Sequence, residues 1–66
     1  MELTVNGEKV QCPEGSTLLD LLQARSLDPK TVVAERNRDI VPAENFGAVC
    51  LQEGDTLELL HFVGGG

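Results

Sequence analysis

Leu57-Glu58-Leu59-Leu60-His61-Phe62-Val63-Gly64-Gly65-Gly66 ends the sequence and joins its most apolar strand-like run directly to three glycines. Glycine has no Cβ, so a glycine segment can thread a narrow channel and adopt backbone angles that other residues avoid. Three residues reach at most about 10 Å beyond a strand. The ending therefore predicts a strand followed by a flexible glycine tail, residues 64–66, that can carry a carboxylate into the active site of a partner.

The two faces of this strand are expected to differ. If Leu57 and Leu59 pack on a helix, strand alternation turns Leu60 and Phe62 to the opposite face. An exposed apolar patch of this kind is typical of a protein interaction site. We therefore predict partner docking at Leu60 and Phe62, with Ala34 of a neighbouring strand at the border of the patch.

The N-terminal residues predict a β-hairpin. Leu3 and Val5 alternate with polar residues, and Asn6-Gly7 follows as the dipeptide that a type I′ turn favours. A two-residue turn fixes the register, so that one face collects the apolar side chains Met1, Leu3, Val5, Val10 and Cys12.

A helix is expected next. Thr17 can cap it, with Asp20 three residues later completing a partial capping box, and Arg25 suits its C-terminal end. Three leucines spaced as one helical stripe should face the core: Leu18, Leu21 and Leu22.

The rest of the chain predicts short strands at 31–35 and 40–41, one loose helical turn within 43–48, and a last strand at 56–63. Residues 49–51 are apolar and should tuck under the sheet. One helix on one face of a mixed sheet of four to five strands gives an α+β roll. The last strand is the most apolar, so we place it centrally and parallel to the first. Residues 1–63 are then one domain.

Composition limits the function. The 66 residues carry a formal charge of −6, which argues against nucleic-acid binding and suits a basic docking surface on a protein partner. No apolar run approaches the length of about 18 residues that suggests a membrane span. The first four residues, Met1-Glu2-Leu3-Thr4, do not resemble a signal peptide, so we expect a cytoplasmic protein that is monomeric when free.

Catalytic and metal-binding constellations are weak. Cys12 and Cys50 lie far apart in sequence; we interpret them as reduced thiols packed as small apolar groups, with a disulfide as the alternative. The single histidine, His61, has no nucleophile placed beside it, and its spacing to the two cysteines does not match a metal site. No phosphate-binding loop is present.

By elimination, the reactive group is the α-carboxylate of Gly66. Its ordinary pKa of about 3.3–3.7 leaves it ionised at neutral pH. A carboxylate is a poor electrophile because its charge repels nucleophiles, so acyl chemistry first needs a leaving group such as AMP. The sequence offers no ATP site, and a partner enzyme must supply that step.

Five segments together resemble the thiamine-biosynthesis sulfur carrier (ThiS) family across essentially the whole chain. They are Val5-Asn6-Gly7-Glu8, Thr17-Leu18-Leu19-Asp20-Leu21-Leu22, Ile40-Val41-Pro42, Glu53-Gly54-Asp55 and Phe62-Val63-Gly64-Gly65-Gly66. The resemblance implies a ubiquitin-like β-grasp fold. It marks Gly65 and Gly66 as functional positions, with Gly66 as the modified residue.

The resemblance also implies a reaction sequence. An adenylating enzyme related to ubiquitin activators uses ATP and magnesium to convert Gly66 to an acyl-adenylate. Sulfur from a cysteine desulfurase or persulfide relay then displaces AMP and leaves a thiocarboxylate. Thiazole synthase takes that sulfur into the thiazole ring of thiamine. On this view the chain binds no cofactor itself and is a co-substrate rather than an enzyme.

Some loop positions depart from the family pattern. Asn37-Arg38 stands where Asn-Gly is expected, Ala43 where a basic residue is expected, and Ser26 where glycine is common. Other functions therefore stay open. They are sulfur delivery to molybdopterin, transfer RNA thiolation or cysteine synthesis, a ubiquitin-like tag joined to lysines, and an interaction domain that does not use its tail.

Overall fold

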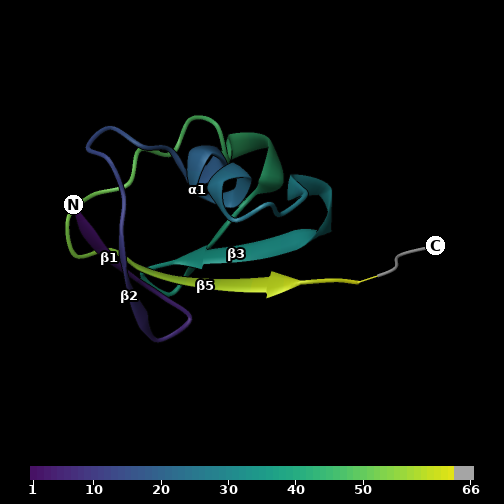
Figure 1. The fold of residues 1–66 in the computed structure, drawn as a ribbon. Coiled ribbons are helices and arrows are strands. Elements are labelled where there is room, and N and C mark those ends of the chain that lie inside the picture. The colour runs from purple at the N-terminus through teal and green to yellow at the C-terminus, as the bar shows by residue number, and fades with distance from the viewer. Residues whose placement is uncertain (64–66) are drawn as a thin grey trace.

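A computed structural model of the chain describes residues 1–63, in which a mixed five-stranded sheet carries one α-helix on one face (Figure 1). The strand order is β2-β1-β5-β3-β4, so the last strand lies at the centre of the sheet. The predicted α+β roll is confirmed. The elements are β1 (Glu2–Val5), β2 (Glu8–Gln11), α1 (Leu18–Ala24), η1 (Pro29–Thr31), β3 (Val32–Arg36), β4 (Asp39–Val41), η2 (Ala43–Asn45) and β5 (Thr56–His61).

The N-terminal hairpin forms as its sequence pattern indicates. β1 and β2 are antiparallel, with Leu3 opposite Val10 and Val5 opposite Glu8. Asn6 and Gly7 have φ values of 50° and 82°, the left-handed pair that a type I′ turn requires. Leu3 and Val5 are buried, and Val10 packs against the core from β2.

Helix α1 begins at a complete capping box. The Asp20 N–H donates to Thr17 Oγ1 at 3.1 Å, and the Thr17 N–H donates to Asp20 Oδ2 at 2.9 Å. The helix ends at Ala24, one residue before the capping Arg25. The predicted leucine stripe is buried against the sheet and consists of Leu18, Leu21 and Leu22.

Strand β5 joins two otherwise separate hairpins. It is parallel to β1, with Val5 opposite Leu57, and antiparallel to β3, with Ala34 opposite Leu59. The strand is shorter than predicted and ends at His61. Phe62 still donates its N–H to the Thr31 carbonyl at 2.8 Å, which extends the pairing by one residue.

The segment from 49 to 51 contributes less to the core than predicted. Leu51 is buried, but Cys50 is exposed, so the interpretation of Cys50 as a packed apolar group is wrong. Cys50 forms an isolated antiparallel bridge with Thr17, and in an extended segment neighbouring side chains point to opposite sides. Both cysteines are free thiols, Cys12 being half-buried.

No helix within residues 1–63 is long and apolar enough to cross a membrane.

Candidate functional site

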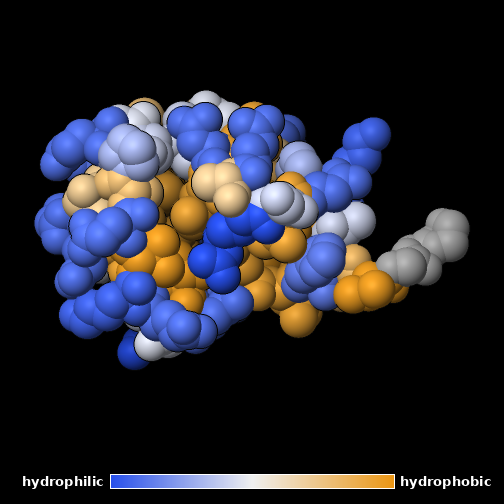
Figure 2. Space-filling view, viewed as in Figure 1, coloured by the Kyte–Doolittle hydropathy of each residue, from blue (hydrophilic) through white to orange (hydrophobic). Residues whose placement is uncertain are grey.

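The sheet face opposite α1 carries exposed apolar side chains. Figure 2 shows hydrophobic surface at the lower right of the molecule, where β5 ends in Figure 1. Leu60 is 60% exposed and Phe62 is 51% exposed. Leu59, which directly precedes Leu60 in β5, is only 8% exposed. Alternation along β5 therefore separates a core face from an outer face, as predicted. The large hydrophobic residues exposed in the described part of the chain are Val33, Ile40, Leu60, Phe62 and Val63.

The strand register groups several of these residues. Val33 of β3 lies directly opposite Leu60 of β5, so their side chains share the outer face. Ile40 of β4 lies opposite Glu35, which is two residues beyond Val33 and therefore on that same face. We name Val33, Ile40, Leu60 and Phe62 the outer-face patch. Docking of a partner on this patch stays a prediction.

Ala34 does not border the patch, and its assignment to the docking surface is wrong. Its exposed fraction is 0%, and it lies opposite the core residue Leu59. Residues that are opposite in an antiparallel pair project to the same face, so Ala34 packs beneath α1. Val33 and Ile40 take its place on the outer face, and sequence reasoning missed both. The register of β3 against β5 is the signal that assigns them.

Asparagine side chains hold the central strand from both sides. The Leu59 N–H donates to Asn6 Oδ1 at 2.7 Å, and Asn6 Nδ2 donates to the Leu59 carbonyl at 3.2 Å. On the other side, the Thr56 N–H donates to Asn37 Oδ1 at 2.9 Å. Both asparagines sit in left-handed turn conformations, with φ values of 50° and 51°. These contacts fix β5, the strand that leads to the patch and to the glycines.

A buried carboxylate secures the start of β5. Asp55 is 6% exposed and accepts hydrogen bonds from Arg36 Nε at 2.8 Å, Asn37 Nδ2 at 3.0 Å and the Gln52 N–H at 2.8 Å. Burial is the largest single influence and alone would raise the pKa of Asp55. The hydrogen bonds from Asn37, Gln52 and Arg36, with the positive charge of Arg36, together outweigh it and lower that pKa below 3.8.

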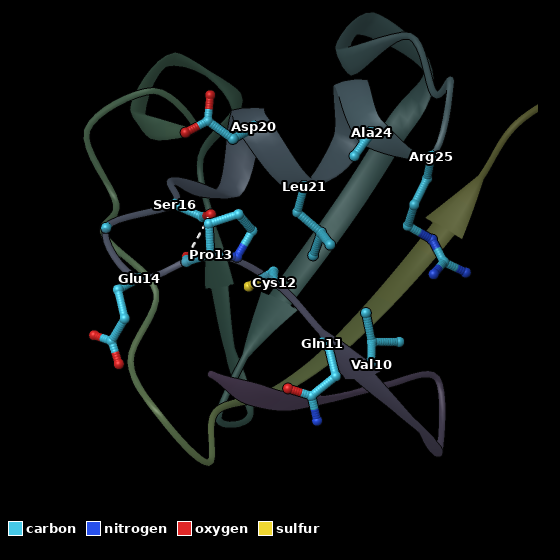
Figure 3. A pocket seen from close by; sticks show the side chains of 11 residues that line it. Val10, Gln11, Cys12, Pro13, Glu14, Ser16, Asp20, Leu21, Ala24 and Arg25 are labelled. Atoms are coloured by element: carbon cyan, nitrogen blue, oxygen red, sulfur yellow. Dashed lines mark hydrogen bonds between the residues drawn. The ribbon is translucent and has the colours of Figure 1, made fainter.

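A groove lies on the opposite, helix-bearing side of the sheet (Figure 3). Its volume is about 580 Å³, and it opens between α1 and the edge strand β2. Val10, Cys12 and Leu21 give it an apolar floor, and Glu14 and Arg25 stand at its rim. None of the predicted docking residues lines it.

The predicted reactive positions Gly64, Gly65 and Gly66 lie outside the described residues. Within residues 1–63, no group of three or more histidine, cysteine, aspartate or glutamate side chains is placed to hold a metal ion. The described residues that precede the glycines in the sequence include Leu60 and Phe62 of the outer-face patch and the strand β5, which Asn6 and Asn37 hold by hydrogen bonds.

Comparisons with known proteins agree with this architecture. A family model described as the ThiS family matches residues 1–66. The chain is 40% identical over 65 residues to the sulfur carrier protein ThiS of Bacillus subtilis, a match that covers 97% of this chain and 98% of that protein. It also superimposes on the crystal structure of the thiamine biosynthesis protein ThiS from Geobacter metallireducens with a TM-score of 0.84, 35% identity and 100% coverage of both chains. This likeness confirms the predicted ubiquitin-like β-grasp fold.

A second kind of relative is longer. The chain is 42% identical over 66 residues to a thiazole synthase of Magnetococcus marinus and 38% identical to one of Paramagnetospirillum magneticum. In both cases the match covers all of this chain but only 20% of the relative. The chain therefore spans about a fifth of the length of these thiazole synthases.

Proposed function

Because the chain belongs to the ThiS family, we propose that it carries sulfur for thiamine biosynthesis, as a thiocarboxylate formed at Gly66. The observation that carries this proposal is the match to a sulfur carrier protein along 98% of that protein's length. The fold is consistent with a carrier that acts as co-substrate of other enzymes.

The proposed chemistry uses the Gly66 carboxylate. It is ionised at neutral pH. One of its oxygens attacks the α-phosphorus of ATP and releases pyrophosphate, which makes AMP a leaving group on the acyl carbon. Hydrosulfide then adds to that carbon and AMP departs, leaving the thiocarboxylate. The adenylating enzyme holds ATP and magnesium in this scheme, and the carrier supplies only the acid.

Docking through the outer-face patch would position the Gly66 carboxylate for this reaction. A partner that covers Leu60 and Phe62 also fixes the point at which the glycines leave the domain. Three residues then span at most about 10 Å, so docking limits where the acid can reach. Side chains larger than hydrogen at these positions would widen the thread, which supports the choice of glycine.

The partners follow from the same scheme. We propose an adenylating enzyme related to ubiquitin activators, a cysteine desulfurase or other sulfur donor, and thiazole synthase as the acceptor of sulfur. The similarity to two thiazole synthases supports the last of these. We also infer a cytoplasmic protein that is monomeric when free.

Intact mass spectrometry tests the proposal. The purified chain is incubated with its adenylating enzyme, ATP, magnesium and sulfide. The expected product is heavier by the mass difference between sulfur and oxygen, and fragmentation assigns the change to Gly66. The variant that lacks Gly66 is the matched control and should stay unmodified while its melting temperature stays unchanged, because the last residues of a domain generally contribute little to its stability.

Rescue of a thiazole auxotroph by the full sequence, and not by that variant, connects the modification to thiamine. If the wild-type chain gained no sulfur while a known ThiS protein did so in parallel, the proposal would be wrong. Isopeptides between Gly66 and cellular lysines would instead indicate a protein tag.

A further inference from the structure

Two glutamates lie opposite each other on the outer face. Glu35 of β3 lies directly opposite Glu58 of β5. Directly opposite residues have Cβ atoms about 4.5–5.5 Å apart, and like charges in that arrangement destabilise a sheet. The pair therefore concentrates negative charge on the outer face, at the strand that leads to the glycines.

Neither glutamate takes part in an ion pair within residues 1–63. The ion pairs within residues 1–63 are Lys9 with Glu2 and Arg36 with Asp55. Arg36 follows Glu35 directly but projects to the opposite side of β3, where its Nε lies 2.8 Å from Asp55 Oδ2. The nearest basic side chain in sequence is thus committed elsewhere, and the two glutamates are left for a group from outside the described domain.

The outer-face patch borders the two glutamates on two sides. Ile40 lies opposite Glu35 on the β4 side, and the Val33–Leu60 pair forms the next row of the sheet. A partner that covers these apolar side chains also excludes water from the carboxylates. Burying two unpaired charges is strongly unfavourable, so a partner that fits this face must bring a cation to them.

We propose that the outer face docks on a partner surface that places an arginine between Glu35 and Glu58, with apolar side chains against Val33, Leu60 and Phe62. A guanidinium group has five N–H donors in a planar fork, which lets it bind carboxylates on either side. This inference rests on the proposed function, in which the first partner is the adenylating enzyme.

A second copy of this chain does not fit the same face. Two copies related by a two-fold axis would bring identical patches together. Such a contact would gather four carboxylates between chains that each carry a formal charge of −6. Charge complementarity therefore favours a basic partner over self-association.

Binding to the adenylating enzyme tests the inference through the double variant Glu35→Gln/Glu58→Gln. The matched control is Glu14→Gln/Glu44→Gln, which removes the same charge from two exposed positions outside the strands. We expect the outer-face double variant to bind about tenfold more weakly at low salt, with a weaker salt dependence, because a buried charge pair is lost. The control should stay within about twofold of wild type, the range of exposed charges.

The stability of the double variant distinguishes docking from a structural role of the two glutamates. If the glutamates only stabilised the fold, their replacement would lower the stability. The outer-face variant should unfold at the same or a slightly higher denaturant concentration than wild type, because repulsion is relieved. Loss of affinity without loss of stability supports the inference.

Equal affinity of the two double variants overturns the inference, and so does sedimentation of the wild-type chain as a dimer that the outer-face substitutions alter. In those cases sulfur loading of wild-type Gly66 would still uphold the proposed function. A wild-type chain that neither binds the adenylating enzyme nor gains sulfur overturns both.

Discussion

The side-chain amide of Asn6 binds the backbone of Leu59 as a paired strand residue would, donating through Nδ2 and accepting through Oδ1. β1 has ended at Val5, so this amide continues the sheet beyond the last residue of the strand. The same residue begins the hairpin turn with φ of 50°. Asn6 thus sets both the turn and the position of β5.

Two substitutions separate these roles of Asn6. Asn6→Gly keeps the left-handed backbone and removes both hydrogen bonds to Leu59, so we expect a loss of about 1–3 kcal/mol. Asn6→Ala also strains the turn by about 1–2 kcal/mol, so its loss should be larger. Urea unfolding measures both values, and hydrogen exchange of the Leu59 amide should quicken in each variant. An unchanged hydrogen-exchange rate at the Leu59 amide would contradict the role of Asn6 in holding β5.

Acid should weaken the fold through Asp55. Its pKa is lower in the folded protein than its ordinary value of 3.8, so the unfolded chain binds this proton more readily. Stability is therefore present above pH 3.8 and is lost as the pH falls through the folded pKa. Urea unfolding between pH 2 and 7, roughly the range in which carboxylates titrate, measures the loss. Asp55→Asn should flatten this dependence, whereas Asp39→Asn, at an exposed position, should leave it in place.

Arg38 occupies a conformation that suits glycine. Its φ of 75° lies in the left-handed region, and Asn37 before it has φ of 51°. Arg38→Gly removes a penalty of about 1–2 kcal/mol but adds the greater chain entropy of glycine, about 0.5–1 kcal/mol. We expect net stabilisation of up to about 1 kcal/mol in thermal unfolding. The reverse change at the other turn, Gly7→Ala, should destabilise, and a destabilised Arg38→Gly variant would contradict the argument.

Neighbouring leucines of β5 should separate folding from binding. Leu59→Ala empties core space and should cost about 2–5 kcal/mol in unfolding free energy, as should Leu21→Ala in α1. Leu60→Ala and Phe62→Ala remove exposed side chains and should stay within about 1 kcal/mol of wild type. These two should instead weaken binding to the adenylating enzyme, measured by titration calorimetry. A loss of stability for Phe62→Ala as large as that for Leu21→Ala would contradict its placement.

Neighbouring residues of β3 should separate folding from binding in the same way, because Val33 lies on the outer face and Ala34 in the core. Val33→Ser should reduce affinity for the adenylating enzyme and change the melting temperature little, because Val33 is 39% exposed. Ala34→Leu should overpack the core against Leu59 and lower stability by about 1–3 kcal/mol. Circular dichroism melts and binding titrations of the two variants distinguish the faces. If the Ala34→Leu variant kept its stability but lost binding, the placement of Ala34 in the core would be wrong.

Local signals in the sequence were sufficient where neighbours in the chain are neighbours in space. Asn6-Gly7 fixes a turn of two residues, and that turn fixes which side chains of the hairpin share a face. The capping box and leucine stripe of α1 are likewise contained within one helix. The central place of β5 was predicted from its apolar character, together with its parallel direction relative to β1.

Features that depend on distant segments were not predictable in the same way. Val32 and Val33 are both apolar, so alternation does not decide which of them faces α1, and Ala34 was assigned to the wrong side. The long connection between β4 and β5 leaves the register of β3 unspecified by any turn. Asp55 binds Arg36 and Asn37, which precede it in the sequence by 19 and 18 positions, so no local motif predicts these hydrogen bonds.

The central place of β5 has a consequence for how the protein is made. Until residues 56–61 leave the ribosome, the two hairpins lack their shared neighbour and the sheet cannot close. Leu60 and Phe62 are then absent or unordered, so an interrupted chain lacks the outer-face patch that we propose as the docking surface. Only chains elongated past His61 can therefore complete the central strand on which the rest of the sheet depends.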